Sequence, residues 1–350
     1  MFNGVRLLEF AICVVLLLGG AGAKDGPPPP ASGAPKMTPQ PGKTITNPIA
    51  PDANDPWVLR HEGAYYYCYS RRGGIWVNSA RTLKEVLQRN GQCVWRPEPD
   101  KPYSKQLWAP ELHRIGDRWY IYFAADDGEN ANHRMYVLAG AGDEPMGPYT
   151  LAGRLAAQSD RWAIDGTVLQ YRGQLYFIWS GWQGDVDVSQ ELYIARMKSP
   201  TELEGERVQI SRPEHDWERS KYPINEGPEV LEHNSRVFVI YSADASWTDA
   251  YCLGQLELVG EDPMDPKAWK KRHVPVFSGD SPHVFGPGHC SFIKSPDGTE
   301  DWIIYHSAKE KGSGWDREGR AQRFEWTAEG QPKFGAPLPA GVEMSAPSGE

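Results

Sequence analysis

Several features that would point to other classes of protein are missing from this chain of 350 residues. It has no CxxC pair and no cysteine and histidine spacing typical of a zinc site. Positive charge is in deficit, since 37 Lys and Arg stand against 46 Asp and Glu, and the net charge of −9 repels phosphate backbones. Beyond the N-terminal segment, no apolar run approaches the roughly 20 residues of a membrane span. These absences argue against nucleic acid as a partner and favour a neutral or cationic ligand.

The first 44 residues read as an export signal and a spacer. Arg6 precedes an apolar stretch at residues 11–18, and Ala21-Gly22-Ala23 offers small residues for cleavage before Lys24. Residues 1–23 are therefore predicted to be a signal peptide, with an uncleaved anchor as the alternative. Residues 24–44 are predicted to be a linker, because seven prolines and three glycines fill the 18 positions from 26 to 43. The expected location is secreted or periplasmic, with no other membrane association.

Four cysteines lie beyond the predicted signal peptide: Cys68, Cys93, Cys252 and Cys290. They allow three pairings. A bridge between Cys68 and Cys93 is compatible with an oxidising compartment, and ordinary buried thiols are the other reading. The sequence leaves this choice open.

One strand pattern occurs five times along the rest of the chain. A short polar segment leads, through a turn with Gly, Asn or Asp, to an aromatic and β-branched run. Within each of four units, ten residues separate the polar segment from the aromatic run, as from Pro56 to Tyr66 and from Pro110 to Tyr120. In the fifth unit this spacing is longer. The units begin at residues 56, 110, 166, 228 and 290, and intervals of 54 to 62 residues suit a sheet of four short strands with its loops.

These repeats predict an all-β fold, a five-bladed β-propeller with four-stranded antiparallel blades over residues 45–345. Closing the ring limits the number of exposed strand edges. Two packed sandwiches would not explain why one pattern returns at a constant internal offset. A short helix or turn is expected at residues 81–90 between strands.

Acidic side chains recur where the repeats begin. Asp55, Asp165, Glu226 and His289 occupy these positions, and Trp108 lies just before the second unit. The first strand of each blade lines the axis of a propeller, so these residues are predicted to converge at one mouth. Each Asp alone would be read as a turn cap, but three buried carboxyl groups together are costly unless they are paired or used.

Three carboxyl groups suit cleavage of a glycosidic bond. One must be protonated to assist the departing oxygen, a second must be ionised to activate water, and the third can keep the two protonation states apart. Nearby aromatic rings would support sugar faces.

The motifs that carry these residues resemble glycoside hydrolase family 43, a group of inverting arabinofuranosidases, arabinanases and β-xylosidases on five-bladed propellers. The resemblance covers roughly residues 45–340 and rests on five segments in order: Asn54-Asp55-Pro56-Trp57, Leu107-Trp108-Ala109-Pro110-Glu111, Ile164-Asp165-Gly166, Glu226-Gly227-Pro228 and Gly288-His289. Each segment alone is a weak signal, and their order, one in each blade, is specific.

The resemblance implies a role for each matching position. Asp55 would be the general base, Glu226 the general acid, and Asp165 the carboxylate that orients the acid and tunes its pKa. Substrate would be bound at Asn54, Trp108, Ala109 and a late arginine, either Arg317, nine residues before Trp326, or Arg320. His289 would face a structural calcium or sodium ion on the axis, held mostly by water. No cofactor is expected for the chemistry itself.

The remaining acids and tryptophans receive plainer readings. Glu111 and Glu229 are expected to form hydrogen bonds within the wall, although Glu111 could reach a substrate. Solvated loops are expected for Asp126, Asp127, Asp185 and Asp187. Blade packing and sugar stacking are equally open for Trp76, Trp182, Trp247 and Trp315.

The expected function is release of terminal α-L-arabinofuranose from a neutral plant polysaccharide or oligosaccharide by a monomeric enzyme. The loops at residues 126–134 and 182–190 are long enough to close one end of the cleft, which favours exo action. A β-xylosidase or galactofuranosidase of the same fold is the nearest alternative. A sugar-binding propeller without catalysis is another, but it would need no cluster of three acids. A retaining fructosidase is disfavoured, because its later motifs are missing.

Overall fold

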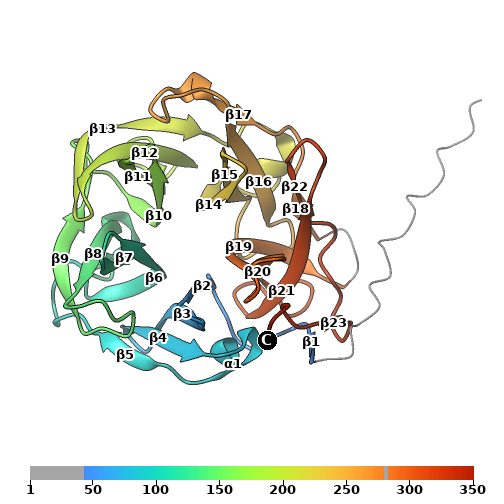
Figure 1. Cartoon of the computed structure of the whole chain (residues 1–350). Helices are drawn as coiled ribbons and strands as arrows, with labels where there is room; N and C mark the ends of the chain where they lie inside the picture. Colours follow the sequence, from blue (N-terminus) through green and yellow to red (C-terminus); the bar gives the residue numbers. More distant parts are fainter. Residues whose placement is uncertain (1–42, 280–282) are drawn as a thin grey trace, which may run out of the picture. The chain divides into compact units, whose positions relative to one another are not determined.

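In the computed structural model, residues 43–279 and 283–350 are described. They contain five antiparallel sheets arranged around a central axis, so the predicted five-bladed propeller is confirmed (Figure 1). The predicted signal peptide, and the predicted linker up to residue 42, lie outside the described residues. No helix among residues 43–279 and 283–350 is long and apolar enough to cross a membrane.

Each blade is a meander of four strands. The first contains β2 (Trp57–His61), β3 (Ala64–Arg71), β4 (Gly74–Ala80) and β5 (Gln92–Trp95). The second contains β6 (Lys105–Ile115), β7 (Arg118–Asp126), β8 (Arg134–Gly140) and β9 (Tyr149–Leu155), and the third β10 (Ala163–Tyr171), β11 (Gln174–Trp182), β12 (Gln190–Ser199) and β13 (Glu202–Ser211).

The last two blades depart slightly from this pattern. The fourth contains β14 (Asn225–His233), β15 (Arg236–Ala243) and β16 (Cys252–Leu258), and β16 pairs with both β17 (Trp269–Lys271) and the short β18 (Phe277–Ser278). The fifth contains β19 (Phe285–Lys294), β20 (Asp301–Ala308), β21 (Arg317–Trp326) and β22 (Pro332–Lys333). The outer strand position of the fourth blade is therefore divided between β17 and β18, which pair with successive parts of β16.

The core consists of five apolar layers, one between each pair of neighbouring blades. Side chains alternate across the second strand of a blade: Tyr120 and Tyr122 of β7 pack toward the third blade, while Ile121 and Phe123 pack toward the first. A strand buried on both faces has no polar face to leave in water, which explains its continuous apolar sequence. Each fully buried aromatic or branched side chain contributes about 1.5–3 kcal/mol.

The innermost strands β2, β6, β10, β14 and β19 face the axis (Figure 1). At the same point in each blade the backbone turns left-handed, with φ values from 41° to 54° at Asp55, Ala109, Asp165, Gly227 and His289. In the second to fifth blades the strand pairing is interrupted there by a bulge. A left-handed conformation costs a residue other than glycine about 1–3 kcal/mol, so four blades retain strain at the axis.

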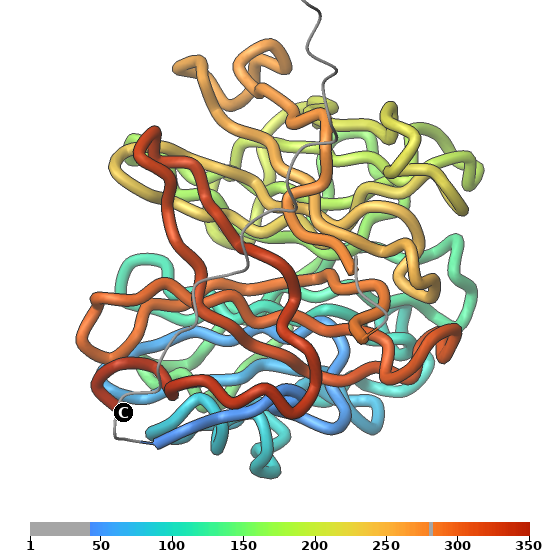
Figure 2. The backbone as a smooth tube through the Cα atoms, turned by 90° about the vertical axis from the view of Figure 1, so that its right-hand side faces the viewer, coloured from blue at the N-terminus to red at the C-terminus, as the bar shows by residue number. Residues whose placement is uncertain are grey.

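The ring closes where the start of the chain meets the fifth blade. Strand β1 (Thr44–Thr46) pairs with β23 (Glu343–Ser345), and the two run side by side in Figure 2. Ala50 bridges Gly319 of β21, and the Asn47 side chain exchanges two hydrogen bonds of 2.9 and 3.0 Å with the backbone of Ala321. These contacts cover the part of the β21 edge that β22 leaves unpaired.

Two smaller expectations can also be compared with the structure. The expected helix is present as α1 (Leu83–Gln88), capped by the Thr82 hydroxyl, which accepts from Glu85 N. The four cysteines within the described residues are free thiols, so no bridge joins Cys68 to Cys93, and Cys93 Sγ instead contacts Trp95 O at 3.4 Å.

Candidate active site

A cavity of about 450 Å³ opens at one mouth of the axis. Each blade contributes a side chain to its wall from the start of its innermost strand: Asp55, Trp108, Asp165, Glu226 and His289. The repeat offsets therefore place these residues around one space. Asn54 also lines the cavity. Ala109 does not, because it is buried at the left-handed position behind Trp108.

Asp55 is the most accessible of the three acids, with 26% of its side chain exposed. His289 Nδ1 lies 3.1 Å from Asp55 Oδ1, and the Asp55 backbone N–H donates to His306 Nδ1 at 3.1 Å. Burial, and then the nearby Arg317, hold the pKa of His306 well below its usual value, so this ring is neutral. His289 therefore holds the carboxylate of Asp55 at the cavity wall, and His306 holds its backbone.

Asp165 lies deeper in the same cluster. Its Oδ2 accepts the Gly227 N–H at 3.1 Å and lies 3.9 Å from His289 Nδ1. Burial, followed by the charges of Glu226 and Asp55, raises the pKa of Asp165 well above its usual value. The contact with Gly227 links Asp165 to the residue directly after Glu226. A Cβ at position 227 would lie 3.1 Å from the His289 ring, and the backbone there is left-handed, so this position requires glycine.

Glu226 is almost fully buried, with 6% of the residue exposed. Burial is the main cause that raises the pKa of its carboxyl group to about 7, and the charge of Asp55 adds to the effect. Tyr251, Ser246 and Arg317 act in the opposite direction. The Tyr251 hydroxyl is buried beside Glu226 and has no partner of regular hydrogen-bond geometry among the described residues.

The two candidate arginines have different surroundings. Arg317 is buried behind Glu226, where its guanidinium donates to the carbonyl oxygens of Ser246 and Gly286. It does not line the cavity, so the structure places it near the general-acid candidate rather than against the open space. Arg320 lies away from the cavity in a buried pair with Glu318, and it also donates to Leu338 O.

Stacked aromatic rings form the wall on the side of the second and third blades. Trp108 stacks on His133 with ring centroids 3.9 Å apart, and Trp162 stacks on Trp182 at 4.8 Å. Trp162 Nε1 donates to Asn130 O at 2.8 Å, which ties the β7–β8 loop to this wall. Trp182 is therefore a packing residue behind Trp162, and Trp162 reaches the cavity.

Sequence reasoning missed several residues of the cavity wall. They come from strand ends and loops outside the repeated motif: Ser70, Gln106, Asn130, Trp162, Gln190 and Ser246. Three of them had a usable signal: Trp162 lies three residues before Asp165, and Asn130 and Gln190 lie in the two loops expected to close the cleft. Both long loops reach the cavity, through Asn130 and through Asp187 with Gln190.

One expectation about acids in loops was wrong. Asp126 is fully buried rather than solvated, because its carboxylate pairs with the buried His133 at 3.1 Å. Asp187 is exposed, as expected, and it also borders the cavity, where partial burial raises its pKa. Asp127 and Asp185 are exposed, as expected.

A second pair of acids lies along the axis outside this cavity. Glu111 Oε2 forms a hydrogen bond of 2.8 Å with His113 Nε2, in agreement with the expected contacts within the wall. Glu229 is buried as well, and its Oε2 has no partner among the described residues. Burial, and then the charge of Glu111, raises the pKa of Glu229 well above its usual value.

The protein side chains around His289 do not complete a cation site by themselves, and an ion held there mostly by water stays a prediction. Among residues 43–279 and 283–350 no group of three or more His, Cys, Asp or Glu side chains is arranged to hold an ion. Calcium takes six to eight oxygen ligands, and His289 Nδ1 is already paired with the carboxylate of Asp55.

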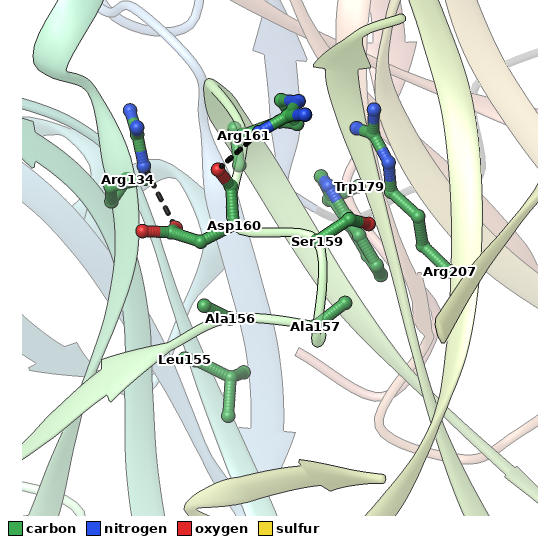
Figure 3. A pocket seen from close by; sticks show the side chains of 10 residues that line it. Arg134, Leu155, Ala156, Ala157, Ser159, Asp160, Arg161, Trp179 and Arg207 are labelled. Atoms are coloured by element: carbon green, nitrogen blue, oxygen red, sulfur yellow. Dashed lines mark hydrogen bonds and ion pairs between the residues drawn. The ribbon is translucent and has the colours of Figure 1, made fainter. Parts of the chain in front are cut away.

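Figure 3 shows a much smaller pocket beside β9 and β10, where Arg134 Nε donates to Asp160 at 2.8 Å. Its volume is about 10 Å³, which is too small for a sugar. Two arginines that line this small pocket contact the β11–β12 loop, which borders the larger cavity. Arg207 donates to the carbonyls of Trp182 and Gln183, and Arg161 pairs with Asp185 at 3.3 Å. Both contacts hold the β11–β12 loop.

A propeller with three clustered carboxyl groups and aromatic walls at one mouth defines a glycoside hydrolase. Residues 45–332 match the model of glycosyl hydrolases family 43, and the chain belongs to that family.

Curated relatives include two enzymes named extracellular exo-α-(1→5)-L-arabinofuranosidase. The one from Streptomyces avermitilis is 35% identical over 86% of this chain, which spans 65% of that protein's length. The one from Streptomyces chartreusis is 35% identical over 85% of this chain and 92% of its own length. Among solved structures, an α-L-arabinofuranosidase from Lactobacillus brevis is 34% identical, with a TM-score of 0.78 over 85% of this chain and 98% of its own.

Proposed function

We propose that the protein is a secreted, inverting exo-α-L-arabinofuranosidase that removes terminal arabinose from plant arabinan, arabinoxylan or their oligosaccharides. Glu226 is the general acid, Asp55 the general base, and Asp165 the group that orients Glu226 and keeps its proton in place. Relatives with arabinofuranosidase names at 35% identity support the sugar. Their description as extracellular and the signal sequence support export. The proposal takes the enzyme to act as a monomer.

The observation that carries the proposal is the contrast between two carboxyl groups in one cavity. Glu226 is buried and holds its proton up to a pKa of about 7, which suits donation to a departing oxygen. Asp55 is more exposed and receives a histidine contact on its carboxylate, which suits activation of a water molecule. Environments that separate two acids in this way are the signature of an acid and base pair.

In the proposed reaction, Glu226 transfers its proton to the glycosidic oxygen as the bond to the anomeric carbon breaks. Asp55 takes a proton from a water molecule that attacks the opposite face of the sugar, so the anomeric configuration inverts. Asp165 remains hydrogen-bonded to Gly227 N and holds the strand that carries Glu226. No step uses a metal ion or cofactor.

Exo action is supported by the two long loops. Asn130 and Gln190 border the cavity from the β7–β8 and β11–β12 loops, and a bound sugar chain would meet them at one end. The remaining alternatives are a β-xylosidase or a galactofuranosidase, since a pocket for a five-membered ring would not separate arabinose from galactofuranose cleanly.

The test is a panel of 4-nitrophenyl glycosides with α-L-arabinofuranosyl, β-xylosyl and β-galactofuranosyl groups. The arabinoside should be hydrolysed fastest, and Asp55→Asn and Glu226→Gln should each lower kcat at least about 10²-fold, the lower range for general acid and base groups. Near-wild-type turnover in either variant would remove that residue from its role. A larger kcat/KM for the xyloside would replace arabinofuranosidase by β-xylosidase.

Stereochemistry gives an independent test. An inverting enzyme needs room for water, so the Asp55 and Glu226 carboxyl groups should lie about 6.5–9.5 Å apart in an experimental structure. NMR should detect β-arabinose as the first product. Formation of the α-anomer first would exclude the inverting mechanism.

A further inference from the structure

Three large aromatic side chains remain exposed on one rim of the cavity. Tyr222 is 48% exposed, Trp247 37% and Trp315 59%. They form a continuous row, since the rings of Tyr222 and Trp247 are 5.1 Å apart and those of Trp247 and Trp315 are 5.6 Å apart. Trp247 and Trp315 also line the cavity itself. We call these three residues the aromatic rim.

The loops that carry the aromatic rim are anchored. Asp244 is fully buried and accepts the backbone N–H groups of Lys221 and Tyr222 at 2.9 and 3.2 Å. Asp249 accepts Gly312 N–H at 2.9 Å in the loop of Trp315, and Lys309 closes that loop through Asp316 at 2.6 Å. Exposed rings on anchored loops are a preorganised surface, which loses little side-chain entropy on binding.

The aromatic rim lies on the side of the cavity from which the leaving group must depart. Trp247 directly follows Ser246, whose side chain acts on the Glu226 carboxyl group and whose carbonyl is held by Arg317. The general acid must face the oxygen of the leaving group, so the chain beyond the cleaved bond begins next to Glu226. From there the rim provides the neighbouring surface.

We propose that Tyr222, Trp247 and Trp315 form a binding platform for at least two sugar units on the leaving-group side of the cleaved bond. This inference rests on the proposed function. Sugar rings carry apolar C–H faces, and exposed aromatic rings bind such faces by stacking and by removing apolar area from water.

The geometry of the platform also points to the shape of the chain. Neighbouring rings are inclined by 55° and 35°, so the surface turns along the row and is not flat. A turning surface follows a flexible chain of furanose units linked through exocyclic carbons better than a flat, ribbon-like chain. The preferred substrates are therefore linear arabino-oligosaccharides of three or more units.

The decisive measurement is kcat/KM for linear α-(1→5)-linked arabinobiose, arabinotriose and arabinotetraose. In the wild type, kcat/KM should rise with chain length. Trp315→Ala should lower the ratio of arabinotriose to arabinobiose about 10-fold, because a lost ring contact is worth about one factor of ten. Tyr222 lies outside the cavity lining, so it should contact a more distant sugar unit. Tyr222→Ala should therefore lower the kcat/KM ratio of arabinotetraose to arabinotriose more than the kcat/KM ratio of arabinotriose to arabinobiose. Equal losses at every length, or no loss, would overturn the platform.

A matched control and a conservative variant test whether the effect comes from the aromatic ring of Trp315. Val188 is 75% exposed on the β11–β12 loop and does not line the cavity, so Val188→Ala should leave the length ratios unchanged. Trp315→Phe should retain most of the length dependence. Thermal melting should be the same for Trp315→Ala and wild type, since the ring is mostly in solvent.

Binding separates failure of the platform from failure of the proposed function. Arabinotriose affinity is measured by calorimetry in the Glu226→Gln protein, with and without Trp315→Ala. A loss of about 10-fold on adding Trp315→Ala supports the platform without any turnover, and an unchanged affinity contradicts it. Wild type that binds arabinotriose through Trp315 but does not hydrolyse it would refute the proposed function and leave the platform standing.

Discussion

At the scale of single residues, protonation in the cavity depends on burial more than on residue type. Asp55, Asp165 and Glu226 meet in one cluster, yet they differ in exposure and in hydrogen-bond donors. In the proposed reaction, the buried environment of Glu226 and the more exposed one of Asp55 separate the acid from the base before any substrate binds.

The pH dependence of the reaction should follow from Glu226. A general acid works only while protonated, so activity should be retained below the pKa of about 7 and fall as the pH rises through it. Tyr251 lowers this pKa, so Tyr251→Phe should move the alkaline limb of kcat/KM to higher pH. The measurement is a pH profile of kcat/KM from pH 4 to 9 for both proteins. A limb that does not move, or moves to lower pH, contradicts this role of Tyr251.

The sequence predicts some of these residues and not others, for a physical reason. Asp55, Asp165, Glu226 and His289 could be predicted because the repeat fixes where the innermost strand begins. Tyr251 and Ser246 could not, because they reach Glu226 from a loop that the repeat does not describe.

The burial of Asp126 could not be predicted either. Its partner His133 lies across the β7–β8 loop, and the solvation of a carboxylate is decided by that single contact. Nothing in the local sequence around Asp126-Asp127 distinguishes the buried carboxylate from its exposed neighbour.

At the scale of elements, a buried charge network fixes the start of β14 just before Glu226, the proposed general acid. Glu218 is fully buried, and its carboxylate accepts from Asn225 Nδ2 at 3.0 Å, from Tyr241 Oη at 2.9 Å and from Lys271 Nζ at 2.7 Å. Burial opposes ionisation of Glu218, but Lys271 and backbone N–H donors hold its pKa below the usual value. Asn225 directly precedes Glu226, so this network positions the acid.

Removing the cation should expose the cost of this network. Lys271→Met leaves the Glu218 charge buried without its partner, and the free energy of unfolding near neutral pH should fall by about 3–5 kcal/mol. Because the folded-state pKa of Glu218 is lowered, the wild-type contribution is present above the unfolded pKa and lost as the pH falls through the folded pKa. The loss caused by the variant should therefore shrink in acid.

Urea unfolding of wild type and Lys271→Met at several pH values measures this effect. Lys198→Met is the control, because the pair of Lys198 and Glu202 lies in solvent and its removal should hardly change the midpoint. If both variants lost the same unfolding free energy, the buried pair of Lys271 and Glu218 would contribute no more to stability than the exposed pair.

Within each blade, some strands could be predicted from the sequence more readily than others. The second strand is buried on both faces, and its continuous apolar run is legible in the sequence. The outer strands are half-solvated and vary, so the division of the outer strand of the fourth blade into β17 and β18 left no recognisable pattern.

At the scale of the whole molecule, the ring is closed by noncovalent contacts alone among the described residues. Its four cysteines are free thiols, and residues 44–50 complete the fifth blade. This closure could not be predicted, because residues 44–50 do not belong to the repeat and fall at the edge of the predicted linker. Their role depends on an unpaired strand edge far away in the sequence.

Asn47 is the residue on which this closure can be tested. Asn47→Ala leaves the buried N–H and C=O of Ala321 unpaired, and each costs about 1–3 kcal/mol. The variant should lose about 2–6 kcal/mol of unfolding free energy, measured by urea or thermal unfolding. Asn90→Ala, which removes only an exposed contact with Arg71, should have a small effect. If the two variants are equally stable, the ring does not depend on Asn47.

The pairing of β1 with β23 has one more consequence. Lys43 O accepts the N–H of Ala346, so the two segments that close the ring lie within hydrogen-bond distance of each other. A short peptide link there, combined with a cut at an exposed hairpin such as that at Gly173 between β10 and β11, would give a circularly permuted protein with the same blades in a new chain order. The catalytic cavity would then be assembled from a chain that reads its five motifs from a different starting point.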